Sequence, residues 1–214
     1  MDADEQDGGL GVGHVTILPR KRRGGGAPRL QAGGCGSVRD VIVWINGTHG
    51  AGKTTTARLL QPLLPDARVL DPEKIGEVLM DVRPPLPDHG DFQHWAPWRP
   101  LVVETATRLL DHVGGTLVLP QTVLVEAYWR EIADGFAARR VPVRHVVLDA
   151  DQDTLRARIE GDTVVGYSLF RMSRLAPYAE AARTWLHDAA QVVSTVGRAP
   201  EEVAREIARS VAAG

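Results

Sequence analysis

The residues that most constrain the fold are those from Gly47 to Thr54, GTHGAGKT, which match the pattern G-x-x-x-x-G-K-[ST] in full. They follow the apolar run VIVWIN (41–46) and precede a segment with helical character. Glycines let successive backbone N–H groups converge on one anion, and the N-terminus of a following helix adds partial positive charge. The pattern therefore predicts a strand, a phosphate-binding loop and a helix. The alternative is a tight strand-to-helix turn that binds no ligand.

Each residue type in this loop has its own expected role. Lys53 can reach the β- and γ-phosphates of a nucleoside triphosphate, and the Thr54 hydroxyl can ligate Mg²⁺. His49 is expected to act as a spacer within the loop, without a catalytic role. The predicted nucleotide-binding residues are Gly47, Thr48, His49, Gly50, Ala51, Gly52, Lys53, Thr54 and Thr55, with Lys53 also catalytic and Thr54 the metal ligand.

From Asp40 onward, β-type apolar runs alternate with segments of helical periodicity. Strands are expected at 41–46, 67–70, 115–120, 143–150 and 191–195, and helices at 53–64, 71–82, 98–113, 126–140, 152–160, about 167–187 and 200–212. In the helix at 98–113, the expected buried face is Leu101, Val102, Thr105, Leu109 and Val113. The alternation predicts an α/β fold of the P-loop NTPase type, with three layers and a parallel five-stranded sheet covered on both faces.

Residues 1–38 differ from the rest of the chain. They are rich in glycine, contain the basic run 20–23, and lack sustained periodicity. A segment of this kind buries too little apolar surface to offset the entropy of ordering. We expect a disordered N-terminal tail followed by one domain at 39–214, unless translation begins near Val38.

Composition excludes several classes of protein. The formal net charge of −2 gives no indication of nucleic-acid binding, and no apolar stretch is long enough to span a membrane. One cysteine, Cys35, rules out an internal disulfide framework and favours a reducing cytoplasm. The start of the chain is acidic and has no apolar signal core.

The other motifs distinguish among proteins with this loop. A guanine-specifying N-K-x-D motif is absent, and the expected third strand ends in Gln121 and Thr122 without a carboxylate. GTPases and motor ATPases are therefore disfavoured. Asp71 and Glu73 follow the second strand, where small-molecule kinases place acidic residues of the acceptor site. Asp71 is the leading candidate for a general base, although it also suits the cap of the helix that follows.

Four segments give the chain a close resemblance to a known family. VIVWINGTHGAGKTTTARLL, VLDPEKIGEVL, DFQHWAPWRPLV and LVLPQTVL follow the order and spacing of the tunicamycin-resistance protein family. The resemblance covers about residues 41–207. It implies a small ATP-binding protein with nucleotide-kinase architecture, which either phosphorylates or sequesters a nucleoside-type antibiotic.

The same resemblance assigns roles to the middle and later segments. The segment DFQHWAPWR, beginning at Asp91, falls where small kinases bind the acceptor, although its tryptophans also suit the core. The predicted substrate-binding residues are Asp71, Glu73, Phe92, Gln93, Trp95, Trp98 and Arg99; Glu126 and Tyr128 are weaker candidates. Of the arginines in the expected lid, Arg156, Arg158, Arg171 and Arg174, the positions of Arg158 and Arg174 best match a catalytic clamp.

Three functions are compatible with these observations. The first is an ATP-dependent phosphotransferase acting on a nucleoside-like hydroxyl acceptor, with ATP and Mg²⁺ as cofactors. The second is an ATP-binding protein that sequesters the antibiotic without chemistry. The third is a regulatory P-loop ATPase. Asp71 and the missing carboxylate after the third strand favour the first over the third.

Overall fold

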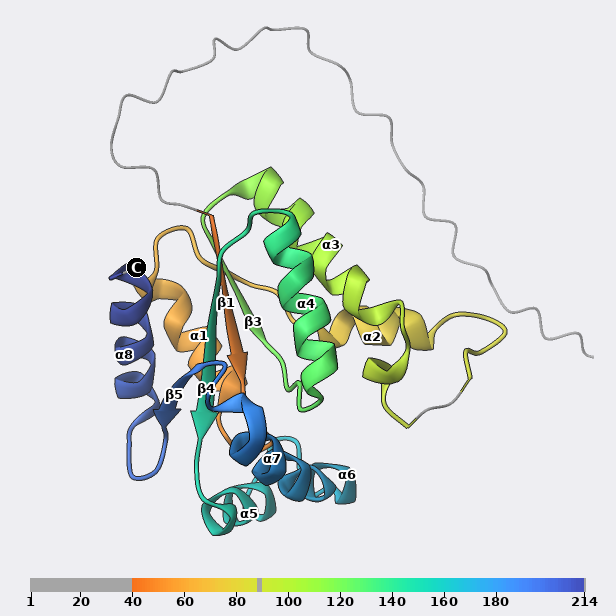
Figure 1. Cartoon of the computed structure of the whole chain (residues 1–214). Helices are drawn as coiled ribbons and strands as arrows, with labels where there is room; N and C mark the ends of the chain where they lie inside the picture. The colour runs from red at the N-terminus through yellow and green to blue at the C-terminus, as the bar shows by residue number, and fades with distance from the viewer. Residues whose placement is uncertain (1–39, 88–89, 214) are drawn as a thin grey trace, which may run out of the picture. The chain divides into compact units, whose positions relative to one another are not determined.

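The computed structural model describes residues 40–87 and 90–213 (Figure 1). The predicted tail at 1–38 lies outside the described residues, and the domain boundary at residue 39 stays a prediction. In the part of the chain that is described, no helix is long and apolar enough to cross a membrane.

The centre of the fold is a five-stranded sheet in which all pairings are parallel. The strands are β1 (Val41–Asn46), β2 (Arg68–Val69), β3 (Thr116–Pro120), β4 (Val143–Asp149) and β5 (Gln191–Ser194), in the order β2-β3-β1-β4-β5. In the central strand, Val43 lies opposite Val118 of β3 and Arg144 of β4. The predicted α/β fold of the P-loop kinase-like type is confirmed, and all strands end at one edge.

Helices cover the sheet and its carboxyl edge. They are α1 (Lys53–Leu60), α2 (Glu73–Met80), α3 (Trp98–Val113), α4 (Glu126–Ala138), α5 (Gln152–Glu160), α6 (Leu169–Ser173), α7 (Leu175–Ala181) and α8 (Pro200–Ala212). Short turns of other helix types lie at η1 (Gln61–Leu63), η2 (Phe92–His94) and η3 (Ala182–Leu186). In Figure 1, α1 and α8 pack together on one side of the sheet, α3 and α4 on the other, and α5 to α7 beyond the arrowheads.

Proline explains where helices differ from the predicted ones. The helix expected at 53–64 tightens into η1 at Gln61, because Pro62 has no N–H to continue the α-helical ladder. The single helix expected at about 167–187 is instead α6, α7 and the π-helical turn η3, with a break at Arg174. Pro177 lies in the first turn of α7, where its missing N–H costs nothing.

The predicted buried face of α3 is correct at Val102 but wrong at Leu101 and Thr105, which are exposed. Leu101 is 40% exposed, whereas the buried residues are Trp98, Arg99, Val102, Val103, Ala106, Thr107 and Leu110. The helix is rotated because it packs against α4 as well as the sheet. Val103 fits close to Gly135 of α4, where an added Cβ would meet its side chain at 3.0 Å.

The core positions the loop that follows β3. Trp44 of β1 is fully buried, and its ring packs edge-on against Trp129 of α4. Trp44 Nε1 donates a hydrogen bond to the Gln121 carbonyl oxygen at 3.2 Å. The core side chains therefore fix the backbone of the β3–α4 loop beside the phosphate-binding loop.

Candidate functional site

The loop between β1 and α1 has the backbone that its glycines permit. Gly47 has φ +131°, and a Cβ there would lie 2.7 Å from the Leu148 carbonyl oxygen. Gly50 has φ +79° and a Cβ would lie 3.0 Å from the Leu155 carbonyl oxygen. Within the described part of the chain, the N–H groups of Gly50 and Gly52 donate to no protein acceptor. The loop thus has the form and the free donors of an anion-binding nest.

Asn46, the last residue of β1, ties this loop to the loop after β3. Its Oδ1 accepts from the N–H groups of Gly47 at 2.8 Å and Val123 at 3.0 Å, and its Nδ2 donates to the Val123 carbonyl at 2.9 Å. The Thr122 hydroxyl donates to the Gly47 carbonyl at 2.7 Å. Sequence reasoning missed Asn46 and Thr122; the only signal was a polar residue closing an otherwise apolar strand.

Lys53 begins α1 with its ammonium group turned back over the loop. Its Nζ donates to the Thr48 carbonyl oxygen at 2.9 Å. The pKa of Lys53 is lowered to about 8, mainly by burial; Glu73 opposes the shift and Arg171 adds to it. The charge of this buried amine is therefore not fully compensated by the protein. A bound phosphate would supply the missing negative charge and stabilise the charged form.

His49 does more than space the loop. Its ring meets the ring of Phe170 edge-on, with centroids 5.8 Å apart. The pKa of His49 is lowered to about 3, mainly by burial and in addition by the nearby charges of Lys53, Arg171 and Arg174. The imidazole is therefore neutral at pH 7, and its side chain lines the pocket described next.

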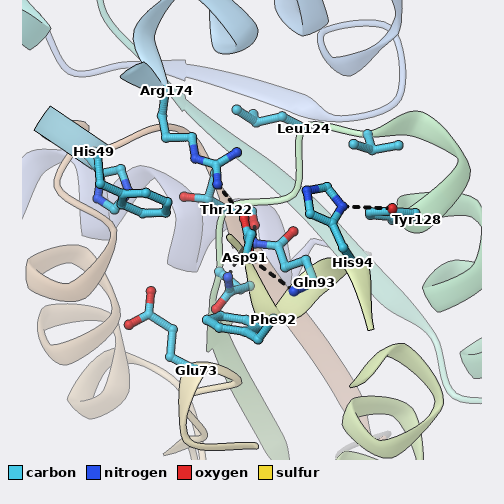
Figure 2. A pocket seen from close by; sticks show the side chains of 13 residues that line it. His49, Glu73, Asp91, Phe92, Gln93, His94, Thr122, Leu124, Tyr128 and Arg174 are labelled. Carbon is cyan, nitrogen blue, oxygen red and sulfur yellow. Dashed lines mark hydrogen bonds and ion pairs between the residues drawn. The ribbon is translucent and has the colours of Figure 1, made fainter. Parts of the chain in front are cut away.

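A pocket opens beside the phosphate-binding loop, between η2, the β3–α4 loop and α6 (Figure 2). Five predicted site residues line it: His49 of the predicted nucleotide-binding set, and Glu73, Phe92, Gln93 and Arg174. Tyr128, a weaker candidate, lines it too. The other lining residues are Asp91, His94, Gln121, Thr122, Leu124, Val125 and Phe170. In Figure 2, His94 points toward Tyr128, with Nδ1 and the hydroxyl oxygen 3.0 Å apart. We call this the acceptor pocket.

The two acidic candidates after β2 occupy different places. Asp71 Oδ1 accepts from the Glu73 N–H at 3.0 Å, which is the helix-capping geometry, and Asp71 does not line the acceptor pocket. Glu73 does line it. Burial raises the pKa of Glu73, and the neighbouring Asp71 carboxylate raises it further, while Lys53 opposes the shift.

Trp95, Trp98 and Arg99 do not line the pocket. Trp98 is fully buried, packs on the Phe92 ring at 5.3 Å and donates from Nε1 to the Pro72 carbonyl. Trp95 Nε1 donates to the Pro87 carbonyl at 2.7 Å. These side chains support the loop that carries Phe92.

Arg99 does not line the pocket but contacts two residues that do, Gln93 and Tyr128. Its Nη1 donates to the Gln93 carbonyl at 2.6 Å, and its guanidinium lies 4.2 Å from the centre of the Tyr128 ring. It also pairs with Glu131 of α4. Arg99 therefore fixes Gln93 and Tyr128, which face the pocket. Glu126 pairs with Arg130 on the exposed side of α4.

Among the arginines of the expected lid, Arg174 and Arg171 are held by ion pairs, whereas Arg156 is exposed. Arg174 Nη2 donates to Asp91 Oδ2 at 2.6 Å, and its guanidinium lies 4.5 Å from the Phe170 ring centre. Arg171 pairs with Asp162 at 2.7 Å and donates to the Gly166 carbonyl. Arg156 is exposed on α5.

Arg158 contacts the phosphate-binding loop but does not line the acceptor pocket. It donates to the Gly50 carbonyl at 3.3 Å and to the Thr195 hydroxyl and carbonyl at 2.9 and 2.8 Å. It lines a second cleft, together with Gly50, Ala51, Gly52, Thr55, Thr56, Thr195, Arg198, Pro200 and Val203. We call this the outer cleft. Two clefts thus share this loop: His49 lines the acceptor pocket, and Gly50, Ala51 and Gly52 line the outer cleft.

The described residues contain no group of three or more His, Cys, Asp or Glu side chains suited to a metal ion. Magnesium bound with a nucleotide needs only one or two protein oxygens, since phosphates and water supply the others. Thr54, exposed in the first turn of α1, and Glu73 beside Lys53 are compatible with that requirement.

The fold and the loop define a P-loop protein with kinase-like architecture. A family model described as an AAA domain matches residues 42–161, over half of the chain, and the chain belongs to this family. No curated protein matches the sequence.

Solved structures extend the comparison. The tunicamycin resistance protein of Deinococcus radiodurans is 25% identical, with a TM-score of 0.66 over 80% of this chain and 96% of that chain. The predicted resemblance to this family is thereby confirmed. A sugar kinase from Janibacter sp. HTCC2649 (18% identity, TM-score 0.55, 78% and 92% covered) shares the fold. The APS kinase of Mycobacterium tuberculosis also shares the fold, with 17% identity and a TM-score of 0.56 over 82% of this chain and 99% of that chain.

Proposed function

We propose that this protein is an ATP-dependent phosphotransferase of the tunicamycin-resistance type, which transfers the γ-phosphate of ATP to a hydroxyl of a nucleoside-like antibiotic or a related acceptor. The observation that carries the proposal is the meeting of two clefts at the phosphate-binding loop. Gly50 and Gly52 line the outer cleft, and His49 lines the acceptor pocket. Holding two substrates in two clefts that share one loop converts a bimolecular transfer into a step within one complex.

The donor side of the site supports ATP binding. In the proposal, the loop from Gly47 to Thr55 holds the phosphates, with Lys53 neutralising the charge of the transferring group. The outer cleft, which runs from Gly52 to Pro200, receives the nucleoside end of ATP. Thr54 holds Mg²⁺, which when bound with ATP neutralises phosphate charge and so admits a nucleophile.

The acceptor side supports a proton acceptor next to the hydroxyl. The acceptor oxygen forms a bond to the γ-phosphorus, the bond from that phosphorus to the ADP oxygen breaks, and the hydroxyl proton passes to a carboxylate. Asp71 and Glu73 are the two candidates. Glu73 lines the acceptor pocket, and its pKa is raised by burial and by the Asp71 carboxylate, which also accepts a hydrogen bond from the Glu73 N–H. We therefore assign proton acceptance to this pair, with Glu73 nearer to the acceptor.

The arginines support charge neutralisation from the acceptor-pocket side. Arg174 lines the pocket and pairs with Asp91, and in the proposal it turns toward the phosphoryl group during transfer. Arg158 is bound to the Gly50 carbonyl and Thr195, so its proposed role is to fix the donor loop and the nucleoside end. The single cysteine and the use of ATP support a cytoplasmic location.

The test is acceptor-dependent ATP consumption with identification of the product. The protein is incubated with ATP, Mg²⁺ and a panel containing tunicamycin and uridine, and both ADP and acceptor mass are followed. Phosphorylation predicts ADP formation only with an acceptor, and an acceptor heavier by one phosphate. ATP-dependent ligand binding without a mass change indicates sequestration. ATP hydrolysis that no acceptor stimulates indicates a regulatory ATPase.

A further inference from the structure

Gln121, the first residue after β3, carries an unused hydrogen-bond acceptor at the acceptor pocket. The residue is 2% exposed and lines the pocket. Its Oε1 is buried and has no hydrogen-bond partner; among the described residues, only His187 Nε2 shares this condition. A buried carbonyl oxygen without a donor is costly, so a protein that retains one needs a reason.

The hydrogen bond of the Gln121 amide nitrogen shows that the atom without a partner is the amide oxygen. Gln121 Nε2 donates to the Thr122 carbonyl oxygen at 3.2 Å. Exchanging the amide oxygen and nitrogen would place the oxygen against that carbonyl, two acceptors facing each other. The atom without a partner is therefore an acceptor, and it requires an N–H or O–H donor.

The backbone of Gln121 cannot move to find one. Its N–H donates to the Ile45 carbonyl at 3.0 Å, and its carbonyl accepts from Trp44 Nε1 at 3.2 Å. The Thr122 carbonyl that holds the amide also accepts from Gln93 Nε2 at 2.9 Å. The side chain is thus held on a rigid frame made by β1, β3 and η2.

Neighbouring polar groups in the pocket already have partners. Asp91 pairs with Arg174, and His94 pairs with Tyr128. We propose that Gln121 Oε1 accepts a hydrogen bond from an N–H or O–H group of the phosphate acceptor and thereby determines specificity. The ligand class is a neutral molecule with such a donor: the imide N–H of a pyrimidine base or a sugar hydroxyl.

The inference rests on the proposed function only in taking this pocket as the acceptor site. The lining side chains leave Oε1 almost no solvent access, so a donor reaches it only when the bound molecule displaces lining side chains. Such a site rejects analogues that lack the donor, because the oxygen is then left buried and unpaired.

The test compares wild type with Gln121→Met, which keeps the approximate size and removes the oxygen. Thr122 keeps its hydrogen bond from Gln93, so the substitution leaves no new unpaired carbonyl there. Without ligand, Gln121→Met is expected to raise the unfolding temperature by about 2–4 °C. The matched control is Gln191→Met, since the Gln191 amide oxygen on β5 already accepts from Ser210. The unfolding temperature of Gln191→Met should not exceed that of wild type.

Ligand binding is then measured without ATP or Mg²⁺, using uridine, 3-methyluridine and 2′,3′-dideoxyuridine as probes. Wild type and Gln191→Met are expected to bind uridine about tenfold more tightly than Gln121→Met. If the base N–H is the donor, 3-methyluridine binds all three proteins with the same weakened affinity. If a ribose hydroxyl is the donor, 2′,3′-dideoxyuridine binds all three proteins with the same weakened affinity.

Two results overturn the inference. One is a lower unfolding temperature for ligand-free Gln121→Met, which would make the amide a structural element. The other is uridine binding that is equal in wild type and Gln121→Met, or absent from both. Phosphate transfer is measured separately. Gln121-dependent binding without transfer would therefore contradict the proposed function and leave this inference standing.

Discussion

Arg174 and Asp91, 83 residues apart in sequence, form an ion pair with 2.6 Å between Nη2 and Oδ2. The Asp91 side chain is 8% exposed, and its second oxygen accepts from the Gln93 N–H at 2.9 Å. One carboxylate thus joins the segment after α6 to the turn η2 that carries Phe92 and Gln93. Movement of Arg174 and order in the acceptor pocket are therefore coupled through Asp91.

The coupling predicts different effects for two substitutions of Asp91. Asp91→Asn keeps an oxygen for the Gln93 N–H but loses the charge, whereas Asp91→Ala loses both. Loss of the cap should cost about 0.5–2 kcal/mol of stability in Asp91→Ala. The KM for the acceptor should rise about tenfold in Asp91→Ala and less in Asp91→Asn, with little change in ATP affinity. Equal KM values for all three proteins would contradict the coupling.

Lys53 should take up a proton when ATP binds in mildly alkaline solution. Its pKa of about 8 lies below the ordinary 10.5, so the unfolded chain holds more protons between these values. Lys53 consequently makes the ligand-free protein more stable as pH rises from about 8 to 10.5. Bound phosphates favour the charged form and raise this pKa.

Calorimetry at about pH 8.5, in buffers of different ionisation enthalpy, measures that proton uptake. Wild type should take up a substantial fraction of one proton per ATP. Lys53→Arg stays charged at this pH and should take up none. Uptake that is the same in both proteins would assign the proton to another group.

The sequence identified the phosphate-binding loop because its chemistry is local. Gly47, Gly50 and Gly52 need positive φ, and their spacing is visible without any knowledge of the fold. The central strands β1 and β3 were predictable for the same reason, since each is an apolar run, whereas β2 consists only of Arg68 and Val69, which are both exposed. The phosphate-loop residues and the centre of the sheet could therefore be read before the structure.

The acceptor pocket could be predicted only in part, because it is assembled from segments far apart in the chain: Glu73, Phe92, Gln93 and Arg174 were predicted and line it, but other lining residues were not. In the sequence, Gln121 stood out only because no carboxylate follows the third strand. Its burial and its unpaired side-chain oxygen are visible only in the structure. The sequence placed Trp98 among the substrate-binding residues, but its side chain packs into the core, because α3 is rotated toward α4. Arg99 faces inward to Glu131 and Tyr128, contacts that depend on tertiary packing alone.

The two carboxylates after β2 can be separated by isosteric substitution. Glu73→Gln keeps the helix and removes the acid nearest the acceptor, so turnover should fall at least a hundredfold, the low end of the range for general acid–base catalysis. Asp71→Asn keeps a capping oxygen and should lower turnover less, by removing a neighbouring charge from Glu73. Steady-state kinetics with measured nucleotide affinity checks both. A larger loss in Asp71→Asn would return the general-base role to Asp71.

The tryptophans beside the pocket should differ in what they stabilise. Trp98→Ala empties a fully buried site and should cost about 3–5 kcal/mol in the free energy of unfolding. Trp95→Ala removes a partly exposed ring and one hydrogen bond and should cost less. Denaturant titration measures both costs. Similar small costs, with a selective loss of acceptor binding, would instead indicate that both rings contact the ligand.

The central claim is that the γ-phosphate of ATP held at the phosphate-binding loop is transferred to an acceptor in the acceptor pocket. The most direct measurement follows the label of [γ-³²P]ATP incubated with tunicamycin, Mg²⁺ and either wild type or Lys53→Met. The account predicts label on the acceptor with wild type and none with Lys53→Met. Label found only as inorganic phosphate, or retained in ATP while the acceptor is bound, would contradict phosphotransfer.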